Sequence, residues 1–154
     1  MKDYEMMVRE YYSPIINQYK LQFEKLDGDE FFLIGKGFAL NVFIDRSDRR
    51  SDVLFVSLDE NGIIKTHSLM DVMEQRFDEH DSSCYGNPSS ADEQVKGYIR
   101  FDVSGLLRHC HDILSGDPNW VNQIIAGGSY SRHVAKFLAP YFKAQEYNVK
   151  PTKV

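Results

Sequence analysis

The 154-residue sequence has only two cysteines, no long apolar segment and no recognisable export signal. Cys84 and Cys110 are too few for a disulfide scaffold, and both suit a reducing cytosol. Acidic residues stand near the start, where a secretory signal carries basic ones, and no run of about 7–15 apolar residues follows. The longest uncharged stretch, 118–131, is polar and shorter than the roughly 20 mostly apolar residues that span a bilayer. We therefore expect a cytoplasmic protein that has no contact with a membrane.

The sequence also lacks a convincing metal-binding motif. His109-Cys110-His111 lies in a helical pattern, where side chains two positions apart point about 200° apart, so the two imidazoles cannot close on one ion. His80 and Cys84 could supply two ligands, but a structural zinc site needs four, usually in closely spaced pairs. The sequence therefore predicts no metal and no cofactor.

Motifs for common catalytic sites are missing as well. Ser129 and Ser131 lie close to His133 in the sequence, but no Gly-x-Ser-x-Gly turn surrounds them and no carboxylate is identified behind the histidine. We expect one of these serines to cap the last helix and His133 to lie on its exposed face. Gly127-Gly128-Ser129 lacks the lysine of a phosphate-binding loop. The sequence predicts no catalytic residue and favours binding over chemistry.

Hydrophobic residues make up 42% of the chain, and a chain of this length can bury an adequate core, so one globular domain is predicted over residues 1–154. Apolar residues at helical spacing predict an N-terminal helix over about 3–17, which Pro14 ends, kinks or restarts. Strands are predicted over 19–24, 30–34, 38–45, 53–58 and 63–66, with turns such as Asp27-Gly28 and Asn61-Gly62 between them. Connections this short join antiparallel neighbours, so we expect an antiparallel meander of about five strands.

The second half of the chain predicts helices packed on this sheet, which makes the fold class α+β. Ser68 and Asp71 have the spacing of a capping box before a helix to Phe77, and a loop is predicted over 78–89. Ser90 and Glu93 begin a long helix whose apolar register continues to Gly116. Its two internal glycines, Gly97 and Gly105, each weaken it by about 1 kcal/mol relative to alanine. A short helix from Pro118 (with Trp120, Ile124 and Ile125, ended by Gly127-Gly128) and a last helix bent by Pro140 follow.

The net charge of −5 is unevenly distributed along the chain. Residues 120–154 hold five basic residues against one acidic, so the first 119 residues carry −9. Between Arg76 and Lys96 there are only acidic charges, from Asp78, Glu79, Asp81, Asp92 and Glu93. A surface of this sign repels nucleic acid and attracts a basic protein partner.

We take these five acids as candidate contact residues for a protein partner. Tyr85 in the same predicted loop joins them, because tyrosine is enriched at interface hot spots. Asp59 and Glu60 in the predicted hairpin complete the set. The alternative is a solvated acidic loop in which Tyr85 is a plain loop residue, and a helix start by itself favours Asp92 and Glu93. We expect that changing Asp78, Glu79 and Asp81 to lysine abolishes binding and leaves the fold intact.

The order of helix, meander and helices, together with Phe31-x-Leu33-x-Gly35-x-Gly37-Phe38-x-Leu40 running into Ile44-Asp45-Arg46, resembles small bacterial immunity proteins. These belong to contact-dependent growth inhibition and related polymorphic toxin systems, and the resemblance covers residues 3–77. It implies a cytosolic protein that binds a cognate toxin domain, often a nuclease acting on tRNA or DNA, and blocks its active site. Such a toxin is basic where it binds nucleic acid, which an acidic inhibitor would complement.

Two other classes of function remain open. One is a small hydrolase or transferase that uses His80, His109 or His133, and the other is a ligand-sensing module with a pocket between the sheet and the helices. Loss of an activity on single histidine-to-alanine changes would favour the first class. A small molecule that copurifies with the protein would favour the second.

Overall fold

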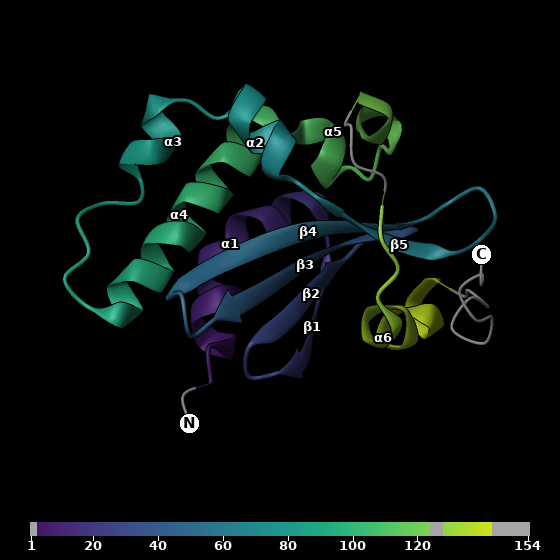
Figure 1. The fold of residues 1–154 in the computed structure, drawn as a ribbon, viewed down its shortest axis with the longest axis horizontal. Helices are drawn as coiled ribbons and strands as arrows, with labels where there is room; N and C mark the ends of the chain where they lie inside the picture. Colours follow the sequence, from purple (N-terminus) through teal and green to yellow (C-terminus); the bar gives the residue numbers. More distant parts are fainter. Residues whose placement is uncertain (1–2, 124–127, 143–154) are drawn as a thin grey trace.

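The first half of the chain forms one helix and a five-stranded antiparallel sheet, as predicted (Figure 1). The structure, a computed structural model, describes residues 3–123 and 128–142. Neighbouring strands follow one another in chain order across the sheet. The elements are α1 (Glu5–Tyr19), β1 (Gln22–Asp27), β2 (Glu30–Ile34), β3 (Phe38–Asp45), β4 (Arg50–Leu58) and β5 (Ile64–Ser68). The predicted bounds of β2 and β3 are confirmed, whereas β4 begins earlier than predicted.

The predicted start of the first strand at Tyr19 is wrong, because α1 continues through Pro14 to that residue. Proline removes the N–H that would bond the carbonyl of Glu10, and the Ser13 hydroxyl donates to that carbonyl instead at 2.8 Å. Lys20, the C-cap that follows the helix, adopts a left-handed conformation with φ of 56°. The chain can then reverse into β1.

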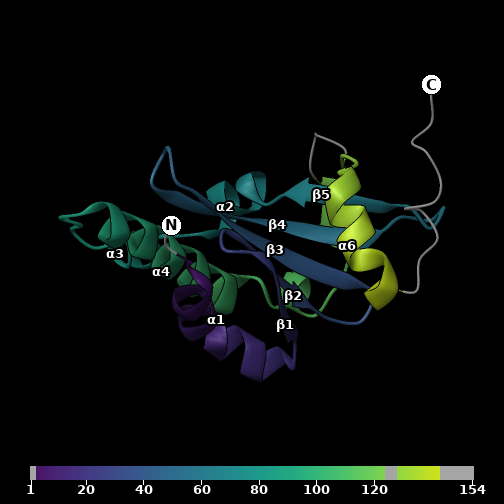
Figure 2. The ribbon, with the colours of Figure 1, turned by 90° about the horizontal axis from the view of Figure 1, so that it is seen from below.

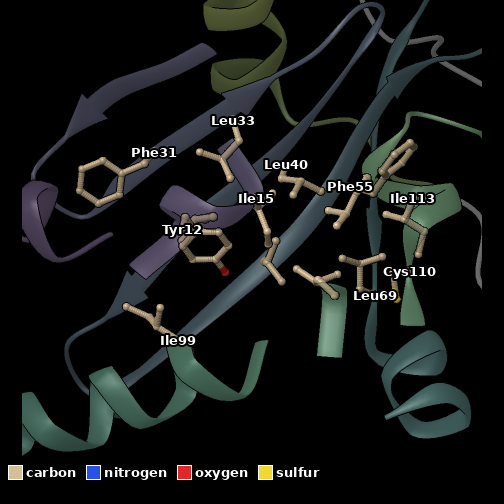
Figure 3. Close-up of a cluster of buried hydrophobic side chains, with 14 of the residues drawn as sticks. Tyr12, Ile15, Phe31, Leu33, Leu40, Phe55, Leu69, Ile99, Cys110 and Ile113 are labelled. Carbon is tan, nitrogen blue, oxygen red and sulfur yellow. The ribbon is translucent and has the colours of Figure 1, made fainter. Parts of the chain in front are cut away.

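Helices cover both faces of the sheet, and its strands β2 and β3 place apolar side chains on both. Phe31 and Leu33 face the larger core with α1 and α4, whereas Phe32 and Ile34 face the smaller core with α6. Figure 2 shows α1 and α4 on one side of the sheet and α6 on the other. In the larger core, side chains from the sheet meet those from α1 and the later helices (Figure 3). This two-sided burial explains why β2 and β3 do not alternate cleanly between apolar and polar residues.

The second half of the chain is helical, as predicted, but its boundaries differ. The elements are α2 (Met70–Arg76), α3 (Glu79–Ser83), α4 (Ala91–His109), α5 (His111–Leu114), the 3-10 helix η1 (Asn119–Gln123) and α6 (Arg132–Phe142). The predicted loop over 78–89 contains α3, and the predicted long helix breaks at Cys110. The N-cap of α2 is Leu69 rather than Ser68, although the Ser68 hydroxyl accepts from the N–H of Met70. Ile124, Ile125 and Gly127 lie outside the described residues.

The break at Cys110 leaves the apolar register intact. Cys110 has a φ of −125°, its N–H bonds to Leu106, and its carbonyl accepts from Leu114, so α5 starts within the same core. Ile113 and Leu114 remain fully buried there. Sequence periodicity therefore located these buried residues correctly but could not show the break between α4 and α5. Within residues 3–123 and 128–142, no helix combines the length and apolar character needed to cross a membrane.

Gly105→Ala should destabilise the protein by about 1–2 kcal/mol, although alanine is the better helix former. A Cβ built at Gly105 would lie 2.2 Å from the Phe77 ring, so α4 needs glycine for close contact with the residue after α2. Thermal or urea denaturation measures the change. Gly105→Ala combined with Phe77→Leu should recover part of the loss, because the smaller side chain makes room. A single Gly105→Ala variant more stable than wild type would contradict this packing.

Candidate binding cleft

The acidic residues predicted as a surface around 78–93 are largely neutralised by the fold. Asp78 caps α3, accepting from the N–H groups of His80 at 3.0 Å and Asp81 at 3.3 Å. Asp81 returns the interaction by accepting from the N–H of Asp78 at 3.0 Å, which completes a capping box. The Asp81 side chain is 0% exposed. It is therefore part of the structure between α3 and α4 and not a surface contact.

Residues from the end of α4 supply the compensating charge. Arg108 Nη1 donates to Asp78 at 2.6 Å and to Asp81 at 2.9 Å, and the hydroxyl of Ser104 donates to Asp81 at 2.7 Å. The Arg108 guanidinium holds the pKa of Asp78 well below its usual range. Burial alone would raise the pKa of Asp81, but the bonds from Ser104, from the Asp78 N–H and from Arg108 outweigh it and lower that pKa. Both carboxylates stay ionised near neutral pH.

The same cluster is the nearest approach to a metal site in the described part of the chain. Asp78, Asp81 and His109 place one ligand atom each within 4.8 Å of one another, and His109 Nε2 lies 3.0 Å from Asp81. Arg108 already bonds both carboxylates, so a cation is present without a metal ion. The arrangement is best explained as an internal ion-pair network that joins α3 to α4.

The other predicted contact residues do not form one surface. Asp92 accepts from the hydroxyl of Tyr4 at 3.3 Å, and Glu93 pairs with Lys96 at 3.3 Å. Glu79 is exposed on α3. The β4–β5 hairpin that carries Asp59 and Glu60 lies at the far end of the sheet from α3 and the start of α4 (Figure 1). The hairpin and the acidic segment cannot act as one continuous acidic surface.

Tyr85 is half-buried rather than exposed. Its ring meets Tyr98 edge-on at 5.0 Å, and its carbonyl accepts from Arg100 at 3.0 Å. Tyr85, Ser82, Tyr98 and Phe101 line a shallow hollow. Tyr98 and Phe101 also form part of the wall of a larger depression.

This larger depression, which we call the β4–α4 cleft, has a volume of about 530 Å³ and lies among β4, α2, α4 and the β3–β4 turn. Its apolar wall includes Phe43, Leu54, Met73, Tyr98 and Phe101, and its acidic residues are Asp45, Asp48, Asp52, Glu74 and Asp102. Among the described residues that line it, Arg50 is the only basic one. Its apolar concave wall offers contact area, and the charged groups around that wall can orient a bound partner.

Asp102 gives the β4–α4 cleft an unusual electrostatic feature. It lies on α4, is 3% exposed, and its Oδ2 atom has no hydrogen-bond partner among the described residues. Burial, followed by the charge of Asp52, raises the pKa of Asp102 well above its usual range, although Arg50 opposes this. The Nε atom of Arg50 is likewise buried without a partner in the described structure. Buried polar atoms are normally bonded, so two such atoms at one cleft call for a functional explanation.

The fold concentrates acid at the cleft by turning neighbouring arginines away from it. In the segment 45–52 the sequence places three acidic and three basic residues side by side. Arg46 binds Asp29 at 2.6 Å and stacks over the Tyr4 ring, and Arg49 does not line the cleft. Because the acidic and basic residues of this segment cancel, a count of local charge missed this site. The one available signal was Asp102, a charged residue on the apolar stripe between Ile99 and Leu106.

A second group of residues bears on the hydrolase alternative. The Ser131 hydroxyl lies 3.1 Å from His133 Nδ1, and His133 Nε2 lies 3.2 Å from Glu30. A serine, a histidine and a carboxylate therefore contact one another in the order found in a catalytic triad. However, the His133 side chain is 62% exposed, and the adjoining hollow carries Asp27 and Asp29. Water competes for such a histidine, and nearby acids disfavour a developing oxyanion. This group does not favour hydrolysis.

His80 and His109 offer less for catalysis. His80 is exposed on α3, and His109 is held against Asp81 within the ion-pair network. His111 bonds the hydroxyl of Tyr19 through Nδ1 at 2.8 Å, away from His109. Cys110 is buried, which raises the pKa of its thiol to about 11 and keeps it protonated. Comparisons with models of protein families, with curated proteins and with solved structures give no match to this chain.

Proposed function

We propose that the protein is an immunity protein that binds a cognate toxin domain, a nuclease, and covers its active site or substrate-binding face. The observation that carries this proposal is the β4–α4 cleft, which joins an acidic rim to an apolar, tyrosine-bearing wall. A nuclease binds phosphates with cationic residues, so an inhibitor that covers that surface needs acidic groups around a desolvated centre. The resemblance over residues 3–77 gives the same expectation.

The proposal moves the contact surface from the segment 78–93 to the cleft. Asp48 and Glu74 are exposed at its rim and come from different elements, the β3–β4 turn and α2. Asp81 is unsuitable for a binding test, because changing it would disturb the α3–α4 network. Tyr85 remains beside the proposed contact surface, since its hollow shares Tyr98 and Phe101 with the cleft.

The test is co-expression with the toxin domain encoded beside this protein, followed by purification and a growth-protection assay. A tight one-to-one complex is expected. The double change Asp48→Lys and Glu74→Lys should weaken binding at least about 10-fold and slow association, because rim charges act mainly on the association rate. The matched control, Glu60→Lys with Glu79→Lys, makes the same change in net charge at exposed positions outside the cleft and should leave protection intact.

The outcomes separate the function from the surface. No complex and no protection would contradict the immunity function. A complex weakened by the control pair, and unaffected by the cleft pair, would place the interface outside the cleft. Protection by both variants with unchanged affinity would also exclude the cleft rim.

A further inference from the structure

The β4–α4 cleft contains polar groups that the chain itself does not satisfy, and these indicate what enters it. Asp102 Oδ2 offers an acceptor when the carboxyl is ionised, and Arg50 Nε offers a donor. A bare metal ion or a simple ammonium ion would satisfy only the carboxylate. An amino-acid residue with a cationic side chain satisfies both, because its side chain donates and its peptide carbonyl accepts.

Part of the β4 edge beside these groups has no partner strand from β5. In the described part of the chain, β5 pairs with β4 only from Leu54 to Leu58, so residues 50–53 of β4 pair with β3 alone. Unpaired strand edges are common places for an extended segment of a partner to bind. The acidic rim selects a segment that carries positive charge.

The aromatic wall favours a guanidinium over an ammonium group. Arg50 already lies over the Tyr98 ring at 5.2 Å from its centroid and bonds Asp52 at 3.1 Å, so this cleft has the chemistry to hold one guanidinium. Phe101 adds a second ring. Guanidinium groups stack on aromatic rings and bond carboxylates through a planar fork, whereas an ammonium group is more strongly hydrated.

We propose that the β4–α4 cleft is the subsite for one arginine of the partner protein, whose guanidinium bonds Asp102 and whose peptide carbonyl accepts from Arg50. This inference rests on the proposed function, because it names the residue of the toxin domain that the cleft receives. The guanidinium would be the cationic partner that the Oδ2 atom of an ionised Asp102 does not have in the unbound protein.

The test uses the isolated protein and needs no toxin. Isotope-labelled protein is titrated with N-acetyl-arginine methylamide and observed by NMR, and N-acetyl-citrulline methylamide, of the same shape without charge, is the comparison. The arginine probe should bind in the millimolar range, at least about 10-fold more tightly than citrulline, and shift amides around Asp52 and Asp102. Asp102→Asn should weaken the arginine probe about 10-fold or more, because a charge-assisted bond is lost. Glu79→Gln, an exposed acid outside the cleft, should leave it unchanged.

Equal binding of the two probes, or an Asp102→Asn variant that binds arginine as wild type does, would overturn the arginine subsite. So would amide shifts confined to residues outside the cleft. These results are independent of the toxin experiment. Selective arginine binding without a toxin complex would support the subsite and contradict the immunity function. A toxin complex without selective arginine binding would support the immunity function and contradict the subsite.

Discussion

Asp81→Ala should lower the free energy of unfolding by about 2–4 kcal/mol, one of the largest losses expected from a single polar side chain in this protein. The change removes the acceptor for Ser104 and for the Asp78 N–H, one of the two acceptors of Arg108, and half of the α3 capping box. Loss of a cap costs about 1 kcal/mol, and loss of a charged hydrogen bond about 1.5–3 kcal/mol. Because the Arg108 side chain is partly exposed, water recovers some of this, so the contributions do not add fully.

Urea denaturation at neutral pH measures this loss, and Glu79→Ala is the matched control. Glu79 is an exposed acid on the same helix, so its removal should change stability by no more than about 0.5 kcal/mol. If the two variants lost equal stability, Asp81 would not be the centre of the network. The amide hydrogens of α3 should also exchange faster in Asp81→Ala, because the change removes half of its capping box and its bonds to Ser104 and Arg108.

The pH dependence of Asp81→Asn provides an independent check on the same carboxylate. The folded pKa of Asp81 is lowered, so its stabilisation is fully present above the unfolded pKa of 3.8 and is lost as the pH falls through the folded pKa. The stability difference between wild type and Asp81→Asn should therefore be constant at neutral pH and narrow below about pH 3.8. A difference that widened in acid would mean that the carboxyl is destabilised by its surroundings.

The sheet was predictable because its signals are local. Gly35-Lys36-Gly37 separates two apolar runs, and these became β2 and β3 with the predicted bounds. The early residues of β4 were missed, because Arg50 and Asp52 are charged yet lie in a strand. These residues are in a strand because they pair with β3, and not because of their own strand propensity.

The candidate site depended on contacts between distant residues, which local patterns do not contain. Arg108 is 27 residues from Asp81 and 30 from Asp78, so the predicted acidic surface ignored the cation that neutralises it. The cleft brings the β3–β4 turn, α2 and α4 together, and no motif spans them. In the sequence, only Asp102 indicates the site. An acidic residue on the apolar stripe of a helix is costly to bury without a partner, so its presence there suggests a function.

Asp102→Asn should stabilise the protein at pH 8, by on the order of 1–2 kcal/mol, the size typical of stabilising substitutions. Asparagine has nearly the same shape and no charge, so it removes the cost of ionising a buried group. The groups facing Asp102 are Tyr12 from α1, Arg50 and Asp52 from β4 and, across the cleft, Glu74 from α2. Burial comes first among the causes that raise the Asp102 pKa, and the negative charge of Asp52 adds to it.

The pH dependence of the stability gained by Asp102→Asn shows whether the gain comes from removing a buried charge or from better packing. The folded pKa of Asp102 is raised, so wild-type stability falls as the pH rises above the unfolded value of 3.8 towards the folded pKa. The gain from Asp102→Asn should therefore be near zero at about pH 3.5 and grow with pH, whereas Asp71→Asn, an exposed acid on α2, should show no such growth. A gain independent of pH would indicate packing instead. If Asp102→Asn both stabilises the fold and weakens the arginine probe, the carboxylate lowers stability in return for binding, which is the trade-off expected of a functional group in a core.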